Sequence, residues 1–269
     1  MRKVLFFLVC ILIYSCNNRE EVVNKSNLLG NDYRLFQNTP AWELAKAVED
    51  DDESKINEIL ARNKYLINYQ ESKFGSNLLL LAIRNQQYNP FKILLENKPN
   101  LEISNSYDGS SAIIEACEYK SYDIKFVELL IKKGANVNDV QVDIEKEGKI
   151  KTPLMMAVKT GKLNLVDLLV KSGADINYQN EYGQSALSES IMVNRYNIAY
   201  FLLQNGADYK QPIFYRPDYS STSESKEANE KGKPMYIADV LQEAPSDYDQ
   251  DKYKLSIIDF LKNKGIKYR

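Results

Sequence analysis

Apolar residues recur at helical spacing in short segments from about residue 40 to the end of the chain. In residues 165–170 and 198–203, leucine, valine and other apolar side chains fall at intervals of three and four positions. This spacing predicts short amphipathic helices, each with one buried stripe. Helices of this length cannot bury an apolar face alone, so we expect neighbouring helices to stack and share a core.

The helical segments return with a fixed period. Leu154 and Leu187 are 33 residues apart, and so are Gly173 and Gly206. Each of these glycines comes just after a predicted helix, where a residue in the left-handed conformation commonly ends the helix. Pro153 stands where a helix should begin, a position that does not need its missing N–H group. The period indicates a repeat architecture.

The repeated segments resemble ankyrin repeats. Residues 152–157 (TPLMMA) are similar to the T-P-L-H-x-A motif, and residues 173–177 (GADIN) are similar to the end of L-L-x-x-G-A-D-x-N. Methionine, serine or isoleucine replaces the motif's histidine at positions 155, 188 and 114. The resemblance implies an all-α solenoid over residues 39–269, with about six helix-turn-helix repeats joined by β-hairpin loops.

The first residues have the pattern of a targeting segment. Arg2 and Lys3 precede an apolar run from Val4 to Tyr14. As a helix this run would span only about 16 Å, against roughly 30 Å of bilayer hydrocarbon, so it predicts a signal peptide of residues 1–15. Residues 13–16 (IYSC) resemble a lipobox, which implies lipidation of Cys16 and a bacterial envelope location, periplasmic or on the cell surface. An ordinary signal peptide, leaving a secreted soluble protein, is the alternative.

Beyond this segment, residues 16–38 are polar and weakly patterned, so we expect a flexible tether there.

The composition of the chain excludes several kinds of catalytic and binding site. There is no histidine, which excludes His-dependent triads and imidazole metal sites, and we expect neither a metal nor a cofactor. The formal net charge of −2 does not favour nucleic acid. If Cys10 leaves with the signal peptide and Cys16 carries lipid, Cys117 is the one remaining thiol, and we expect it in the core.

Two insertions and three turns are candidate contact sites for a protein partner. Residues 140–151 alternate apolar and polar side chains and predict a lengthened hairpin; residues 210–233 form a larger break in the repeat. A surface insertion without a role, and aromatics that merely pack on their neighbours, are the alternatives. The candidate residues are Val142 and Ile144 in the first insertion, Phe214, Tyr215 and Tyr219 in the second, and Phe74, Tyr107 and Tyr182 beside glycines at the expected hairpin tips.

These features favour a monomeric, non-catalytic protein-binding module, attached to a membrane through Cys16. Two narrower roles remain open: an immunity protein that neutralises a toxin, and an adaptor for an envelope enzyme. The alternative from another class is an enzyme or metal-binding protein that uses carboxylates alone. Such a site would require Asp and Glu side chains from separate repeats to converge in one cleft.

Overall fold

The structure is a computed structural model in which residues 21–118, 123–143, 148–216, 232–243 and 250–266 are described. The chain divides into two compact units, Met1–Tyr107 and Asp108–Arg269. Three candidate residues, Cys16, Ile144 and Tyr219, lie outside the described residues.

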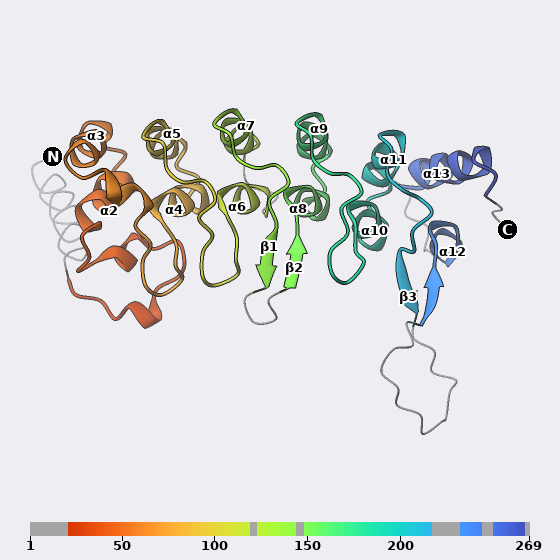
Figure 1. Cartoon of the computed structure of the whole chain (residues 1–269), viewed down its shortest axis with the longest axis horizontal. Coiled ribbons are helices and arrows are strands. Elements are labelled where there is room, and N and C mark those ends of the chain that lie inside the picture. Colours follow the sequence, from red (N-terminus) through yellow and green to blue (C-terminus); the bar gives the residue numbers. More distant parts are fainter. Residues whose placement is uncertain (1–20, 119–122, 144–147, 217–231, 244–249, 267–269) are drawn as a thin grey trace, which may run out of the picture. The chain divides into compact units, whose positions relative to one another are not determined.

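The first unit is built from short helices. Its elements are the 3₁₀ helices η1 (Lys25–Asn27), η2 (Tyr33–Phe36) and η3 (Lys64–Asn68) and the α-helices α2 (Trp42–Glu49), α3 (Glu53–Arg62), α4 (Leu78–Arg84) and α5 (Tyr88–Glu96). Helix α2 packs on α3 and α4, and α3 packs on α5. The helices therefore lie in two rows, α2 with α4 and α3 with α5, and the core lies between them (Figure 1). Helix α4 is buried along Leu78–Ile83, as expected for a helix inside a stack.

The segment before α2 differs from the expected tether. Residues 21–38 contain η1 and η2, and Leu35 and Phe36 on η2 are fully buried. Helix η2 contacts α2, so this part of the segment belongs to the core of the first unit. Two apolar side chains in one turn explain the difference, because burying them offsets the entropy that an ordered segment loses.

The second unit repeats the same plan. Its helices are α6 (Ala112–Glu118), α7 (Lys125–Lys132), α8 (Pro153–Thr160), α9 (Leu163–Lys171), α10 (Ala186–Met192), α11 (Tyr196–Gln204), α12 (Ile237–Glu243) and α13 (Asp251–Asn263). Helix α8 packs between α6 and α10, while α11 contacts α9 and α13. Within this unit α6, α8 and α10 lie in one row and α7, α9 and α11 in another (Figure 1). The all-α expectation is confirmed.

The ends of these helices follow the sequence. Pro153 is the first residue of α8, and the Thr152 side chain caps it by accepting a hydrogen bond from the Met155 amide at 3.3 Å. Gly173 and Gly206 follow α9 and α11 with φ of 92° and 94°, the left-handed conformation expected of them. No helix in the described part of the chain is long and apolar enough to cross a bilayer.

Two antiparallel hairpins complete the second unit. Strand β1 (Gln141–Asp143) pairs with β2 (Gly148–Lys151), which confirms the hairpin expected at residues 140–151. Strand β3 (Phe214–Arg216) pairs with β4 (Lys233–Met235). The second hairpin was not predicted, because its strands are only three residues long and stand far apart in the sequence.

Candidate protein-binding surfaces

A buried carboxylate organises the loop between η3 and α4. Glu71 accepts hydrogen bonds from the backbone amides of Lys73 (2.7 Å), Phe74 (2.9 Å) and Ser76 (2.9 Å). Gly75 closes the turn with φ of 66°, a conformation that glycine adopts without strain. The turn of residues 71–76 is therefore fixed from within, and so is the position of the Phe74 backbone.

The next loop of the first unit places Tyr107 against Phe74. The Asn105 side chain accepts from the Tyr107 amide at 2.9 Å, and the Ser106 amide donates to the Phe74 carbonyl at 2.8 Å. The two rings meet edge to face, with centroids 5.5 Å apart. Tyr107 nevertheless exposes 72 % of its surface. Two of the predicted tip aromatics thus pack on each other, as the packing alternative expects, while one of them remains open to solvent.

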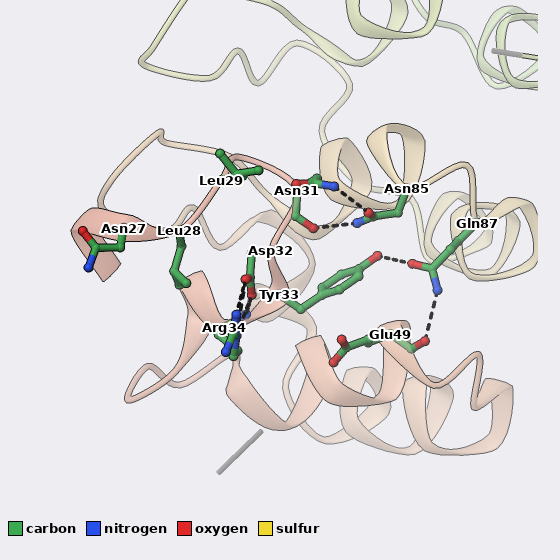
Figure 2. A pocket seen from close by; sticks show the side chains of 10 residues that line it. All are labelled: Asn27, Leu28, Leu29, Asn31, Asp32, Tyr33, Arg34, Glu49, Asn85 and Gln87. Carbon is green, nitrogen blue, oxygen red and sulfur yellow. Dashed lines mark hydrogen bonds and ion pairs between the residues drawn. The ribbon is translucent and has the colours of Figure 1, made fainter. Parts of the chain in front are cut away.

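A polar pocket lies beside the N-terminal segment of the first unit (Figure 2). Its volume is about 840 Å³, and it is open to solvent. The lining residues come from the N-terminal segment and from the ends of α2 and α4: Asn27, Leu28, Leu29, Asn31, Asp32, Tyr33, Arg34, Glu49, Asn85 and Gln87.

Hydrogen bonds connect the two walls of this pocket. Asn85 donates to the Asn31 carbonyl at 2.8 Å, and the buried Tyr33 hydroxyl donates to the Gln87 side chain. Gln87 in turn donates to the Glu49 carbonyl at 3.0 Å. Figure 2 shows Asn31 and Asn85 pointing toward each other between the two walls. The pocket is therefore a preformed polar surface.

The charged pair at the pocket edge is Asp32 and Arg34, whose side chains lie 2.7 Å apart. Burial alone raises the pKa of Asp32, but the hydrogen bonds and the charge of Arg34 outweigh it and hold that pKa below its ordinary value. Asp32 is thus an anion that already has its counter-ion. Sequence reasoning missed the pocket because it assigned residues 16–38 to a tether; the spacing of Tyr33, Leu35 and Phe36 was the available signal.

In the second unit, hydrogen bonds to neighbouring loops hold both strands of the first hairpin. Gln141 on β1 is buried and donates to the Ser110 hydroxyl at 2.9 Å, while Asn180 donates to the Ile150 carbonyl on β2 at 2.9 Å. Val142, by contrast, exposes 40 % of its surface. The strand therefore turns its polar residue inward and its apolar residue outward, the reverse of a strand that packs on an apolar core.

Asn180 also fixes the loop that presents Tyr182. Its side-chain oxygen accepts from the amides of Tyr182 (3.0 Å) and Gln184 (2.9 Å), and Tyr182 exposes 54 % of its surface. Lys151 at the end of β2 is half-buried. Burial lowers the pKa of Lys151, nearby Glu189 raises it and neighbouring Lys159 lowers it, with a net decrease. The hairpin end thus lies close to charges on α8 and α10.

The remaining candidates lie on the second hairpin. Phe214 on β3 is partly buried and faces Met235 in the register, and Tyr215 is exposed opposite Pro234. Arg216 pairs with Glu243 of α12 and ties the hairpin to that helix. The hairpin places Phe214 and Tyr215 on one short strand.

Two other sequence features have structural roles. Cys117 is fully buried on α6, as expected, and burial raises the pKa of its thiol. The acidic run of residues 49–53 joins α2 to α3, and Asp52 caps α3 by accepting from the Lys55 amide at 2.9 Å. Among the described residues, no three or more His, Cys, Asp or Glu side chains gather in a way that could hold a metal ion.

Comparisons with known proteins place the fold in a family. A family model described as ankyrin repeats (3 copies) matches residues 44–141 and 125–212. An ankyrin repeat protein of Acanthamoeba polyphaga mimivirus is 32 % identical over 151 residues, which cover 54 % of this chain and 88 % of that protein.

Two further relatives are longer than the region they share with this chain. A second mimivirus ankyrin repeat protein is 26 % identical over 153 residues, 54 % of this chain and 19 % of that protein. The mouse B-cell lymphoma 3 protein homolog is 29 % identical over 140 residues, 51 % of this chain and 30 % of that protein. The family model covers more than half of the residues of this chain. The chain belongs to the ankyrin repeat family.

Proposed function

We propose that this protein is a non-catalytic binding module for another protein. One observation carries the proposal: Tyr107 is largely exposed, yet Phe74 and Asn105 hold it in place. A tyrosine fixed before binding offers a large contact area and loses little rotamer freedom on association. In the second unit the Asn180 side chain accepts from the Tyr182 amide as Asn105 accepts from the Tyr107 amide. Membership of the ankyrin repeat family supports the same conclusion.

The proposal includes a membrane anchor. The basic start, the short apolar run and Cys16 support a bacterial lipoprotein whose binding domain stays at the membrane surface, on the periplasmic side or outside the cell. A lipid on Cys16 would attach the chain without a membrane-spanning helix. We propose that the attached protein is a monomer and that the binding surface faces a soluble or membrane partner.

Affinity purification tests the binding role. The full chain, tagged at its C-terminus, is isolated from its native membrane in mild detergent, and the proteins that accompany it are identified by mass spectrometry. We expect one stoichiometric partner, whose recovery falls at least about tenfold with Tyr107→Ser or Tyr182→Ser, because an aromatic anchor contributes about 2 kcal/mol or more. Tyr65→Ser is the matched control, since Tyr65 is 91 % exposed but lies on η3, outside these turns.

Each of two results would contradict a different part of this proposal. The first is a partner recovered equally by all three variants, which would place the contact elsewhere. The second is enzymatic turnover that depends on an Asp or Glu side chain, which would favour the carboxylate-only enzyme. The identity of the partner separates the narrower roles: an imported toxin indicates an immunity protein, and an envelope enzyme indicates an adaptor.

Metabolic labelling tests the anchor separately. Cells that express the full chain are grown with a clickable palmitate analogue, and the label is followed on the purified protein. We expect label on the unmodified chain and none on Cys16→Ser, with the variant recovered from the soluble fraction. Cys117→Ser serves as the control and should stay labelled. Equal label on both cysteine variants, or none on the unmodified chain, would remove the anchor from the proposal.

A further inference from the structure

Residues 26–31 lie across the first unit and are held there mainly through their backbone carbonyls. The Lys73 ammonium donates to the carbonyls of residues 26 and 28, both at 2.8 Å. Arg84 donates to the carbonyl of residue 30 at 3.1 Å, and Asn85 to that of residue 31 at 2.8 Å. Four carbonyls within six residues are thus bound by side chains of the turn 71–76 and of the end of α4.

Two of these donors also make contacts outside the segment. Lys73 is on the turn that Glu71 organises, and its ammonium also lies 4.6 Å from the centre of the Phe74 ring. Arg84 donates in addition to the Ser76 hydroxyl at 2.8 Å. Gly30 lies against the Phe74 ring, where an added Cβ would be 3.9 Å from a ring carbon. The donors and this ring form what we call the carbonyl-binding surface: Lys73, Phe74, Arg84 and Asn85.

The side chains of the segment contribute little to this contact. Leu28 is its one buried side chain, at 8 % exposure, whereas Leu29 exposes 73 % and Ser26 and Asn27 are exposed. Two residues beyond the segment the side chains become buried: Tyr33, Leu35 and Phe36 are all buried. Free energies of local opening follow buried apolar area, so residues 26–31 should open far more readily than η2.

We propose that the carbonyl-binding surface is a docking site for a peptide segment of the partner protein that adopts the conformation of residues 26–31, and that residues 26–31 occupy this site in cis. The inference rests on the proposed binding function and specifies its partner. Backbone carbonyls are common to every peptide, so the donors recognise a main chain whose carbonyls are placed as in residues 26–31, and the Leu28 position selects one apolar side chain. Lys73 and Arg84 bring positive charge, which suits carbonyl oxygens and the acidic flanks of such a peptide.

The cis segment sets the affinity that a partner must reach. A segment attached next to its site has an effective concentration on the order of millimolar, so a partner peptide binds only after it outcompetes this local copy. Loosening the cis segment should therefore strengthen binding of any peptide in trans. That consequence can be measured without knowing the partner.

The probe is a fluorescently labelled synthetic peptide with the sequence of residues 24–31 (NKSNLLGN), titrated into the full chain and followed by fluorescence anisotropy. We expect weak binding to the unmodified chain and at least about tenfold tighter binding to Leu28→Asp, which removes the buried contact of the cis copy. Val22→Asp is the matched control, because Val22 is exposed and outside residues 26–31; its affinity should equal that of the unmodified chain. Adding Lys73→Ala to Leu28→Asp should abolish the gain.

Hydrogen exchange on the same proteins gives a second measurement. We expect the amides of residues 26–31 to exchange much faster than those of Leu35 and Phe36, and faster again in Leu28→Asp. Fluorescence of Trp42, the one tryptophan, checks that each variant keeps the fold of the first unit. Equal affinities for the unmodified chain and Leu28→Asp, an unchanged gain after Lys73→Ala, or exchange at residues 26–31 as slow as at Leu35 would each overturn the proposal.

A failure of this inference can be distinguished from a failure of the proposed binding function. If purification yields a partner that depends on Tyr107 but is neither enriched by Leu28→Asp nor displaced by the peptide, the carbonyl-binding surface is not its docking site and the binding function stands. If the partner is enriched by Leu28→Asp and displaced by the peptide, the inference is supported in the intact protein.

Discussion

Phe74 and Tyr107 contact each other edge to face, their ring planes inclined at 85°, although they belong to different loops separated by the pair α4 and α5. The contact links two successive turns of the first unit at their tips. Edge-to-face pairs contribute about 0.5–1.5 kcal/mol beyond the area they bury, and the exposure of Tyr107 favours the lower value.

A double-mutant cycle measures this contact. We expect Phe74→Ala and Tyr107→Ala to be coupled by about 0.5 kcal/mol in the free energy of unfolding of the first unit. Urea titration followed by Trp42 fluorescence reports on that unit, because the tryptophan lies on α2. Phe74→Ala paired with Tyr65→Ala is the control cycle and should show no coupling. Additivity in both cycles would show that the rings do not stabilise each other in solution.

The buried carboxylate of Glu71 should be essential to the turn that presents Phe74 and Lys73. Glu71→Ala leaves three backbone amides without their acceptor, and we expect a loss of about 1–3 kcal/mol in the free energy of unfolding. Glu71→Gln keeps one acceptor oxygen and should cost less. Glu96→Ala, an exposed glutamate on α5, should change stability by at most about 0.5 kcal/mol. A Glu71→Ala chain as stable as Glu96→Ala would rule out this role.

Gly109 should be far less replaceable than Gly173, although both have positive φ, 73° and 92°. A Cβ at Gly109 would come within 2.3 Å of the Val142 carbonyl oxygen, whereas one at Gly173 would meet nothing within 4 Å. Gly173→Ala should cost about 1–2 kcal/mol from the backbone conformation alone. Gly109→Ala adds displacement of β1, so its thermal midpoint, followed by circular dichroism, should fall several degrees further. Equal midpoints would mean that the first hairpin does not rest on Gly109.

Cys117 should be unreactive while the protein is folded. Burial raises the pKa of its thiol, so the folded chain keeps the proton at pH 8 and no thiolate is available to a disulfide reagent. We expect mass spectrometry to find the peptide that contains Cys117 labelled in denaturant and unlabelled without it. Rapid labelling in native buffer would show that α6 opens readily.

The same raised pKa has a consequence for stability. Below about pH 8.5 both folded and unfolded thiols are protonated, so the contribution of Cys117 to stability is constant there. Above that pH the unfolded chain releases its proton first, so stability should fall as the pH rises. In Cys117→Ala this component is absent, and the decline between pH 8.5 and 10 should be shallower than in the unmodified chain. Parallel declines would assign the pH dependence to other groups.

The sequence by itself determined the local architecture. The period of 33 residues, Pro153 at a helix start and the glycines after α9 and α11 predicted the helix pairs, because helix initiation and termination depend on residues close in the chain. The first hairpin was predicted for the same reason, from alternation within one short stretch. The number of repeats, the lipid anchor and the partner remain predictions.

Only the tertiary structure decided which distant residues meet. The sequence predicts a polar tether at residues 26–31. Their binding to Lys73, Arg84 and Asn85 leaves no sequence signal, because it uses backbone carbonyls that every sequence contains. Glu71 and Asn105 show no pattern as turn residues until their loops are folded. The outward direction of Val142 follows from the hydrogen bond of Gln141 to Ser110, a long-range contact that alternation along the strand cannot reveal. Short-range pattern specifies elements, and contacts between elements specify surfaces, because each such contact depends on two parts of the chain at once.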